Sequence, residues 1–304
     1  VLETVLLRQR ARTKFTRADR MYFEREALEQ ASGERIARHR AERYRGAASV
    51  ADLCAGLGGD AIGLASVAPT VVVDRDPLRV ALASANLRAY DLRGDAILRD
   101  LEVDGPPAAA ALWCDPGRRA GGRRLHRVAD YQPPLPLVAS WSERTPALGI
   151  KLSPGVDLDE LHAIEAEREF ISVEGELKEC VLWFGPLATA RWRATVMGQE
   201  SSDSLWGEHH DTHHLSAAPA STRPVGRVLY EPDAAVIRAG QVRALADRLG
   251  AHLIDPTIAY LSADDAVMTP FARAFDVEAV LPFHLKRLRQ LLVERGIGRV
   301  TVKK

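Results

Sequence analysis

The sequence has few cysteines and no long apolar run. Its three cysteines, Cys54, Cys114 and Cys180, are spread over 304 residues, and their number and spacing fit neither a disulfide framework nor a cysteine zinc site. No stretch reaches the roughly 20 apolar residues of a membrane helix. The first residues, VLETVLLRQRARTKF, lack the ordered regions of a secretory signal. We therefore expect a cytoplasmic protein that is not embedded in a membrane.

The net charge is zero, but the charges are distributed unevenly. Residues 1–46 and 227–304 carry net charges of +5 and +3, whereas residues 47–150 and 151–226 carry −1 and −7. Basic ends around an acidic middle suit a nucleic-acid partner that reaches across domains. Solvated helix faces would give the same distribution, so the charges alone leave both interpretations open.

Changes in composition divide the chain into four segments. Residues 1–46 are rich in Ala, Leu, Glu and Arg without proline, which predicts a helical extension with a break at Gly33. Residues 47–199 alternate apolar runs with helical patterns. Residues 200–226 are rich in Ser, His, Ala and Pro and indicate a linker or exposed loop. Residues 227–304 predict a small α+β domain with a closing strand over residues 297–302.

The second segment predicts an α/β sheet. Short apolar runs are expected to form strands near residues 49–53, 71–73, 96–98, 111–114, 147–152, 170–173 and 192–196. Because helical patterns separate most of these strands, we expect a parallel sheet that is covered on both faces. Asp76 followed by Pro77 is a typical start of the helix after the second strand.

A glycine-rich turn follows the first predicted strand. Residues 52–60 read Asp-Leu-Cys-Ala-Gly-Leu-Gly-Gly-Asp. Glycine allows a sharp turn and a close approach of a ligand to the backbone, and the helix after it offers free N–H groups. A single turn of this kind is weak evidence, because nicotinamide and flavin enzymes use a similar one.

Acidic residues follow three further strands. Asp74 ends the second strand, Asp100 follows the third, and Asp115 and Pro116 follow the fourth. Parallel strands bring these positions to one crevice, where Asp74 could accept hydrogen bonds from the ribose of a nucleoside cofactor and Asp100 could meet an adenine. Together with the glycine-rich turn, these positions indicate a nucleoside cofactor.

These motifs resemble the class I S-adenosylmethionine-dependent methyltransferases. The runs 52–65 and 73–86 are similar to those of trimethylguanosine synthase-like RNA methyltransferases, and Lys14, Phe15 and residues 21–23 resemble the helical extension of that group. The C-terminal segment, ending in residues 297–304, resembles a THUMP-like domain. The resemblance implies a Rossmann-like class I methyltransferase sheet with an N-terminal helical extension and a small C-terminal α+β domain.

The resemblance also implies roles for individual residues. S-adenosylmethionine would be bound by Asp52, Cys54, Ala55, Gly56, Gly58, Gly59, Asp60, Asp74, Arg75 and Asp100. Asp115 and Pro116 would lie beside the transferred methyl group. The substrate, RNA with a base nitrogen as the acceptor, would be bound by Lys14, Phe15, Arg118, Arg119, Arg123 and Arg124. No metal is expected to take part.

The catalytic motif departs from the pattern of methyltransferases that act on exocyclic base amines. Those enzymes place Pro-Pro-aromatic after the acid or amide, whereas this chain has Asp115-Pro116-Gly117-Arg118. An arginine plane could stack on a base in place of the aromatic ring. Alternatively, the acceptor is not a base amine, or the chain is a catalytically altered RNA-binding protein on a methyltransferase fold.

Two further interpretations fit parts of the sequence. A nicotinamide-dependent oxidoreductase could use a similar sheet, but the sequence offers no Tyr-Lys or His-Asp arrangement for hydride transfer. The histidines of residues 208–214 could bind zinc, but they fall in the low-complexity segment, so an exposed polar loop is the favoured interpretation.

Overall fold

The computed structural model describes residues 2–120, 123–125, 127–210 and 223–302. It divides into two compact units: residues 1–212 with 233–245, and residues 213–232 with 246–304. The predicted domain boundaries stay predictions. Residues 233–245, which fall in the predicted C-terminal segment, group with the first unit. Among the described residues, no helix is both long and apolar enough to cross a membrane.

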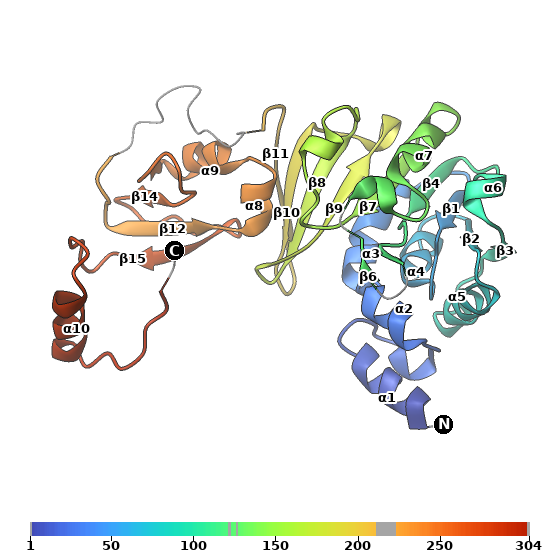
Figure 1. Cartoon of the computed structure of the whole chain (residues 1–304), viewed down its shortest axis with the longest axis horizontal. Helices are drawn as coiled ribbons and strands as arrows, with labels where there is room; N and C mark the ends of the chain where they lie inside the picture. Colours follow the sequence, from blue (N-terminus) through green and yellow to red (C-terminus); the bar gives the residue numbers. More distant parts are fainter. Residues whose placement is uncertain (1, 121–122, 126, 211–222, 303–304) are drawn as a thin grey trace. The chain divides into compact units, whose positions relative to one another are not determined.

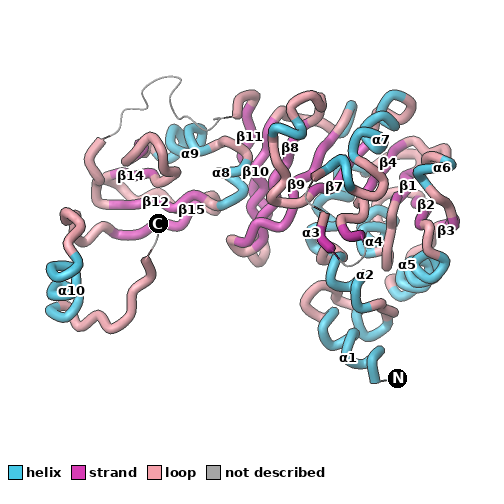
Figure 2. The backbone as a smooth tube through the Cα atoms, in the orientation of Figure 1, coloured by secondary structure: helices cyan, strands magenta, loops and turns pink. Residues whose placement is uncertain are grey.

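A nine-stranded sheet forms the centre of the first unit (Figures 1 and 2). Its strand order is β11-β10-β8-β9-β7-β4-β1-β2-β3. The strands are β1 (Val50–Leu53), β2 (Thr70–Asp74), β3 (Asp95–Leu98), β4 (Ala111–Cys114), β7 (Leu148–Leu152), β8 (Glu167–Val173), β9 (Glu176–Trp183), β10 (Trp192–Met197) and β11 (Ser202–Gly207). Strands β3, β2, β1, β4 and β7 are mutually parallel. This parallel half confirms the expected α/β sheet.

The other half of the sheet is mixed and differs from the expectation. Strand β9 pairs antiparallel with both β7 and β8, and β11 pairs antiparallel with β10. The sequence analysis did not predict β9, because its first residues alternate charged and apolar types and resemble a surface segment. It also assigned the residues of β11 to a linker, although they form the edge of the sheet.

Helices pack on the sheet and form the N-terminal extension. They are α1 (Leu2–Ala11), α2 (Arg25–Gln30), α3 (Glu34–Ala41), α4 (Gly59–Ala65), α5 (Pro77–Ala89), α6 (Leu101–Asp104), α7 (Leu135–Ser140) and α8 (Ala234–Arg238). The expected break at Gly33 is confirmed, since Gly33 is the N-cap of α3. The side chain of Asp76 accepts a hydrogen bond from the Leu78 N–H and caps α5 as expected.

The second unit contains a four-stranded sheet in the order β13-β14-β12-β15. Its elements are α9 (Val242–Leu249, which begins in the first unit), β12 (Val228–Pro232), β13 (His252–Leu253), β14 (Leu261–Ala263), β15 (Ala272–Asp276) and α10 (Leu285–Glu294). The small α+β domain is confirmed, but the strand expected over residues 297–302 is wrong, because these described residues form no strand. Ile297, Val300, Thr301 and Val302 are residue types common in strands, yet no described strand pairs with these residues.

The N-terminal extension shares its cores with α4 and the sheet. One core joins Leu7, Phe15 and Met21 to Ile62 of α4 and Leu87 of α5. A second core joins α3 to the sheet and includes the rings of Tyr44, Trp113 and Trp183. The extension is therefore part of the first unit's core and not an appendage.

Gly63 sets the closest approach between two of these helices. A Cβ at Gly63 of α4 would lie 2.7 Å from the carbonyl oxygen of Ala37 in α3, a backbone atom that cannot rotate away. We expect Gly63→Ala to lower the free energy of unfolding, because overpacking of about 1–3 kcal/mol exceeds the roughly 1 kcal/mol that alanine gains in a helix. Urea denaturation measures the difference. Gly155→Ala, where a Cβ meets nothing within 4 Å, is the control, and a Gly63→Ala protein as stable as the wild type would contradict this packing.

Glu34 anchors the extension to α5 through a buried carboxylate. It accepts hydrogen bonds from the Thr16 N–H (2.8 Å), the Thr16 hydroxyl (2.8 Å) and the Tyr90 hydroxyl (2.7 Å). Burial alone would raise the pKa of Glu34, but these hydrogen bonds and the charge of Arg38 outweigh it and hold the pKa below its usual 4.5. A depressed folded-state pKa stabilises the fold above the unfolded value, and this stability is lost as the pH falls through the folded value.

We therefore expect the stabilising effect of Glu34 to be present at pH 7 and to disappear below about pH 4.5. Glu34→Gln should lower the melting temperature at pH 7 by on the order of 3 °C, with a smaller difference at pH 3.5. Thermal unfolding at several pH values measures this, with the exposed Glu143→Gln as the control. A difference from the wild type that stays constant with pH would count against it.

Candidate cofactor and methyl-transfer site

The glycine-rich turn joins β1 to α4 by a strained backbone path. Cys54, Gly56 and Gly58 all have positive φ, at 61°, 56° and 83°, a region that favours glycine. A Cβ at Gly58 would lie 2.9 Å from the Cα of Ala83 in α5. A Cβ at Gly56 would meet nothing within 4 Å, because this residue faces a cavity. The first position requires glycine for packing, and the second leaves the backbone open to a ligand.

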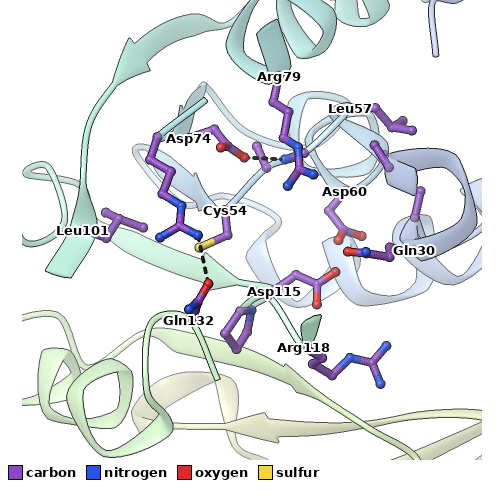
Figure 3. Close-up of a pocket in the computed structure, with 18 of the residues that line it drawn as sticks. Gln30, Cys54, Leu57, Asp60, Asp74, Arg79, Leu101, Asp115, Arg118 and Gln132 are labelled. Atoms are coloured by element: carbon purple, nitrogen blue, oxygen red, sulfur yellow. Dashed lines mark hydrogen bonds between the residues drawn. The ribbon is translucent and has the colours of Figure 1, made fainter. Parts of the chain in front are cut away.

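The cavity has a volume of about 500 Å³ and lies at the carboxyl ends of β1, β2 and β4. Most residues expected at the site line it: Cys54, Ala55, Gly56, Gly59, Asp60, Asp74, Arg75, Asp100, Asp115, Pro116 and Arg118. Figure 3 shows the side chains of Asp60, Asp74 and Asp115 reaching the cavity from different elements. The strand ends therefore meet as the sequence pattern indicated.

Asp74 is held in place by backbone donors. One of its carboxylate oxygens accepts the Gly56 N–H at 2.9 Å (Figure 3), and the other accepts the Asp76 N–H at 3.0 Å. A carboxylate offers about four lone-pair positions, so two remain for a ligand in the cavity. Asp100 is the N-cap of α6 and accepts the Glu102 N–H at 3.0 Å.

Asp52 lies beneath the turn and does not line the cavity. It is fully buried, and neither carboxyl oxygen has a hydrogen-bond partner among the described residues. Burial raises the pKa of Asp52 well above its usual range, and the nearby charges of Asp60 and Asp115 raise it further. The side chain therefore has unused hydrogen-bonding capacity under the floor of the site.

Lys14 and Phe15 lie behind a wall of the cavity. The Lys14 ammonium donates to the carbonyl oxygens of Leu28, Glu29 and Ala31, at 2.8, 3.1 and 2.8 Å, and the Phe15 side chain is buried. Neither lines the cavity. The expected substrate contacts of both residues stay a prediction, and what the structure gives them is support of α2.

Helix α2 supplies a wall that the sequence analysis missed. Residues 26, 27 and 29–32 line the cavity, including Gln30, which is labelled in Figure 3. No local motif marks these residues, because their position depends on the fold of the extension over the sheet. Only the resemblance of the extension to a cofactor-covering segment hinted at this.

Arg118 lines the cavity beside Pro116. The backbones of Arg119 and Arg123–Arg124 form a two-stranded pair, β5 (Arg119–Ala120) with β6 (Arg123–Arg124), but their side chains, and residues 121–122, lie outside what the structure describes. Gly117 bridges to Gln132 through reciprocal backbone hydrogen bonds of 2.7 and 3.0 Å. The Gln132 side chain accepts from Arg75 at 2.9 Å (Figure 3).

The histidine-rich segment is only partly described. His210 shares a hydrogen bond with the Arg238 carbonyl oxygen at 3.2 Å, and its ring lies 4.2 Å from that of Trp192. Residues 211–214 lie outside the described residues. Within the described ranges, no group of three His, Cys, Asp or Glu side chains is arranged to hold a metal ion.

Comparison with known proteins identifies the family. The chain is 36% identical to an uncharacterised S-adenosylmethionine-dependent methyltransferase of Mycobacterium tuberculosis, found in strains CDC 1551 and H37Rv, over 98% of this chain and 82% of that protein. The chain belongs to the S-adenosylmethionine-dependent methyltransferases. Residues 272–304 match the family described as THUMP domain-like. A Porphyromonas gingivalis W83 crystal structure, of a protein called a methyltransferase with no stated substrate, matches with a TM-score of 0.79 and 25% identity, covering 95% of this chain and 76% of that one.

The cavity of this methyltransferase suits its cofactor. Among the residues whose side chains the structure describes, seven carboxylic groups line it against four guanidinium groups, so this lining favours a cation such as a sulfonium. Gly56 leaves open space for a close approach, and Asp74, which accepts the Gly56 N–H, lines the same cavity. The oxidoreductase interpretation fits this cavity less well, because the pyrophosphate of a nicotinamide cofactor would meet an excess of negative charge.

The positions of these residues suggest which step of methyl transfer each would assist. When bound, the cofactor supplies a methyl group on sulfur whose leaving group is already activated. The turn and Asp74 would fix the position of the nucleoside, and the α2 wall would limit access of water. Asp115 would orient the acceptor atom. Such alignment is a large part of what a displacement at carbon requires.

Asp74→Ala should weaken binding of S-adenosylmethionine by about 10- to 100-fold, because it removes charged acceptors worth roughly 1.5–3 kcal/mol. Isothermal titration calorimetry with S-adenosylmethionine and S-adenosylhomocysteine measures the change. Asp95→Ala, at the exposed start of β3, removes the same group away from the cavity and should bind normally. Equal affinity of both variants would refute the role of Asp74.

Proposed function

We propose that this enzyme methylates RNA, with a base nitrogen as the acceptor. The observation that carries the proposal is the position of Asp115, whose carboxylate enters the cofactor cavity directly beside Pro116 and Arg118. A carboxylate at that point can accept a hydrogen bond from an N–H group and orient its lone pair toward the methyl carbon.

Residue roles follow from this placement. Cys54, Ala55, Gly56, Gly59 and Asp60 would contact the methionine part of the cofactor, with Gly58 shaping the turn and Asp52 supporting it from below. Asp74 would bind the ribose, and Arg75 and Asp100 would face the adenine. Each of these assignments rests on position in the cavity or directly beneath it.

Two features support RNA as the substrate class. The C-terminal residues match a THUMP domain-like family, and THUMP domains bind RNA. The loop that carries the acceptor site continues from Arg118 into a run with Arg119, Arg123 and Arg124. Cationic side chains beside the reacting base would bind backbone phosphates and set the register of the RNA.

Recognition of the base would differ from stacking on an aromatic ring. No aromatic side chain lines the cavity in the described part of the chain. Among the side chains that line the cavity, the guanidinium of Arg118 is the planar group closest in sequence to Asp115. Its Nη1 atom is buried without a hydrogen-bond partner among the described residues. Stacking of its guanidinium on the base, as arginine planes do in RNA complexes, supplies the missing plane.

The test is methyl transfer from labelled S-adenosylmethionine to separate pools of RNA, DNA, protein and small molecules. We expect label in RNA and a methylated base nitrogen in the nucleosides after digestion. Asp115→Ala should lower the rate about 10²- to 10⁴-fold and leave cofactor affinity within about threefold. Label confined to protein or small molecules would overturn the RNA assignment, and an unchanged rate in the variant would overturn the role of Asp115.

A further inference from the structure

The register of the sheet places a lysine behind the acceptor site. Strands β4 and β7 pair in parallel with Cys114 opposite Ile150, so the next residues along each strand, Asp115 and Lys151, lie side by side. The Lys151 ammonium contacts Asp115 Oδ2 at 2.5 Å. The lysine side chain is 5% exposed and that of the aspartate is 23% exposed. Only the aspartate lines the cavity.

This contact leaves the two oxygens of Asp115 in different states. Oδ2 is bound by the ammonium, whereas Oδ1 has no hydrogen-bond partner among the described residues. A charge-assisted hydrogen bond to one oxygen restricts rotation of the carboxylate. Because Asp115 lines the cavity, its second oxygen can accept a hydrogen bond from a ligand bound there.

Asp115 lies among other carboxyl groups, and Lys151 partly offsets their charge. The charges of Asp60 and Asp115 raise the pKa of Asp52. The charge of Asp115 also raises the pKa of Glu179 on β9, whereas the charge of Lys151 lowers it. Arg40 is committed elsewhere, to Asp60 and to Glu179, the latter at 2.6 Å. Lys151 is the cation in direct contact with Asp115 among the described residues.

We propose that Lys151 is a positioning residue for methyl transfer: it holds Asp115 through Oδ2 so that Oδ1 receives the hydrogen bond of the acceptor atom. In the reaction, the acceptor lone pair forms the new bond to the methyl carbon and the carbon–sulfur electrons stay on the sulfur. The acceptor N–H or O–H proton passes to Oδ1. The proposal rests on the proposed role of Asp115, but not on RNA as the acceptor.

The experiment is a double-mutant cycle on the turnover rate. Lys151→Met keeps the length of the side chain without its charge, and we expect kcat to fall by about 10- to 100-fold, part of the effect of a positioned base, with cofactor affinity within about twofold. In an Asp115→Asn background the same change should cost less than threefold, because the lysine acts through the aspartate. Lys151→Arg should recover part of the rate.

Lys178→Met is the matched control. Lys178 lies on β9, is partly exposed and pairs with Glu176 at 2.6 Å, so its loss changes the same charge outside the cavity and should leave kcat unchanged. Equal losses from Lys151→Met in both backgrounds, or none in the wild-type background, would overturn the proposal. If the Lys151→Met protein does not fold, the double variant that combines Asp115→Asn with Lys151→Met is used, because it removes both charges. Its kcat is compared with that of Asp115→Asn alone and with that of Lys151→Gln.

The methyl acceptor is a total extract of RNA, protein and small molecules that is separated into classes after the reaction. Label outside RNA would overturn the proposal that RNA is the substrate, but the double-mutant cycle on Lys151 and Asp115 could still be measured with the labelled class of molecule. Label in RNA with an additive cycle would support the proposed function and overturn the role of Lys151. The two failures are therefore distinguishable.

Discussion

A single buried guanidinium joins the parts of the molecule that form the cofactor cavity. Arg40 of α3 is 2% exposed, forms ion pairs with Asp60 of α4 and Glu179 of β9, and lies over the Trp113 ring at 4.6 Å. Removing one partner of such a buried pair costs about 3–5 kcal/mol, because the remaining charge is uncompensated. The N-terminal extension, the helix after the glycine-rich turn and the mixed half of the sheet thus depend on one side chain.

The same contacts set the electrostatic character of the site. Four carboxyl groups, those of Asp52, Asp60, Asp115 and Glu179, lie near two cations, Arg40 and Lys151, which form ion pairs with all of them except Asp52. Burial raises the pKa of both Asp52 and Glu179, although Arg40 opposes the shift in each. Asp60 and Asp115 of this cluster line the cavity, whereas Asp52 lies beneath the turn. A site of this kind favours a cationic ligand over an anionic one.

The sequence predicted the features that depend on residues close together in the chain. The glycine-rich turn, the carboxylate of Asp74 and the cap at Asp76 all arise from local backbone geometry, and the structure places each as expected. Strand β9 was missed because its burial comes from neighbours on both sides, and half of its residues would suit a surface. Residues 297–302 were predicted to form a closing strand, but a short run of strand-forming residue types does not supply a pairing partner.

The missed site residues share one physical reason. The cavity wall of α2, the Arg40 ion pairs and the contact between Lys151 and Asp115 each join segments 20 to 139 residues apart in the chain. No local pattern encodes such a pair, because each partner by itself resembles an ordinary surface charge. Lys14 shows the converse case: the resemblance placed it near the site, but its ammonium is used by three backbone carbonyl groups.

Two contacts hold Asp115 and the loop after it, in the altered motif that follows β4. Lys151 holds its side chain, and the backbone bridge between Gly117 and Gln132 holds the loop that follows it. Neither support involves the second proline or the aromatic ring that this chain lacks. The position of the acid is thus independent of the residues that would stack on a base, so Gly117 and Arg118 can replace them without moving the acceptor oxygen. Under the proposed function, the altered motif would therefore change how the substrate is recognised more than how the methyl group is transferred.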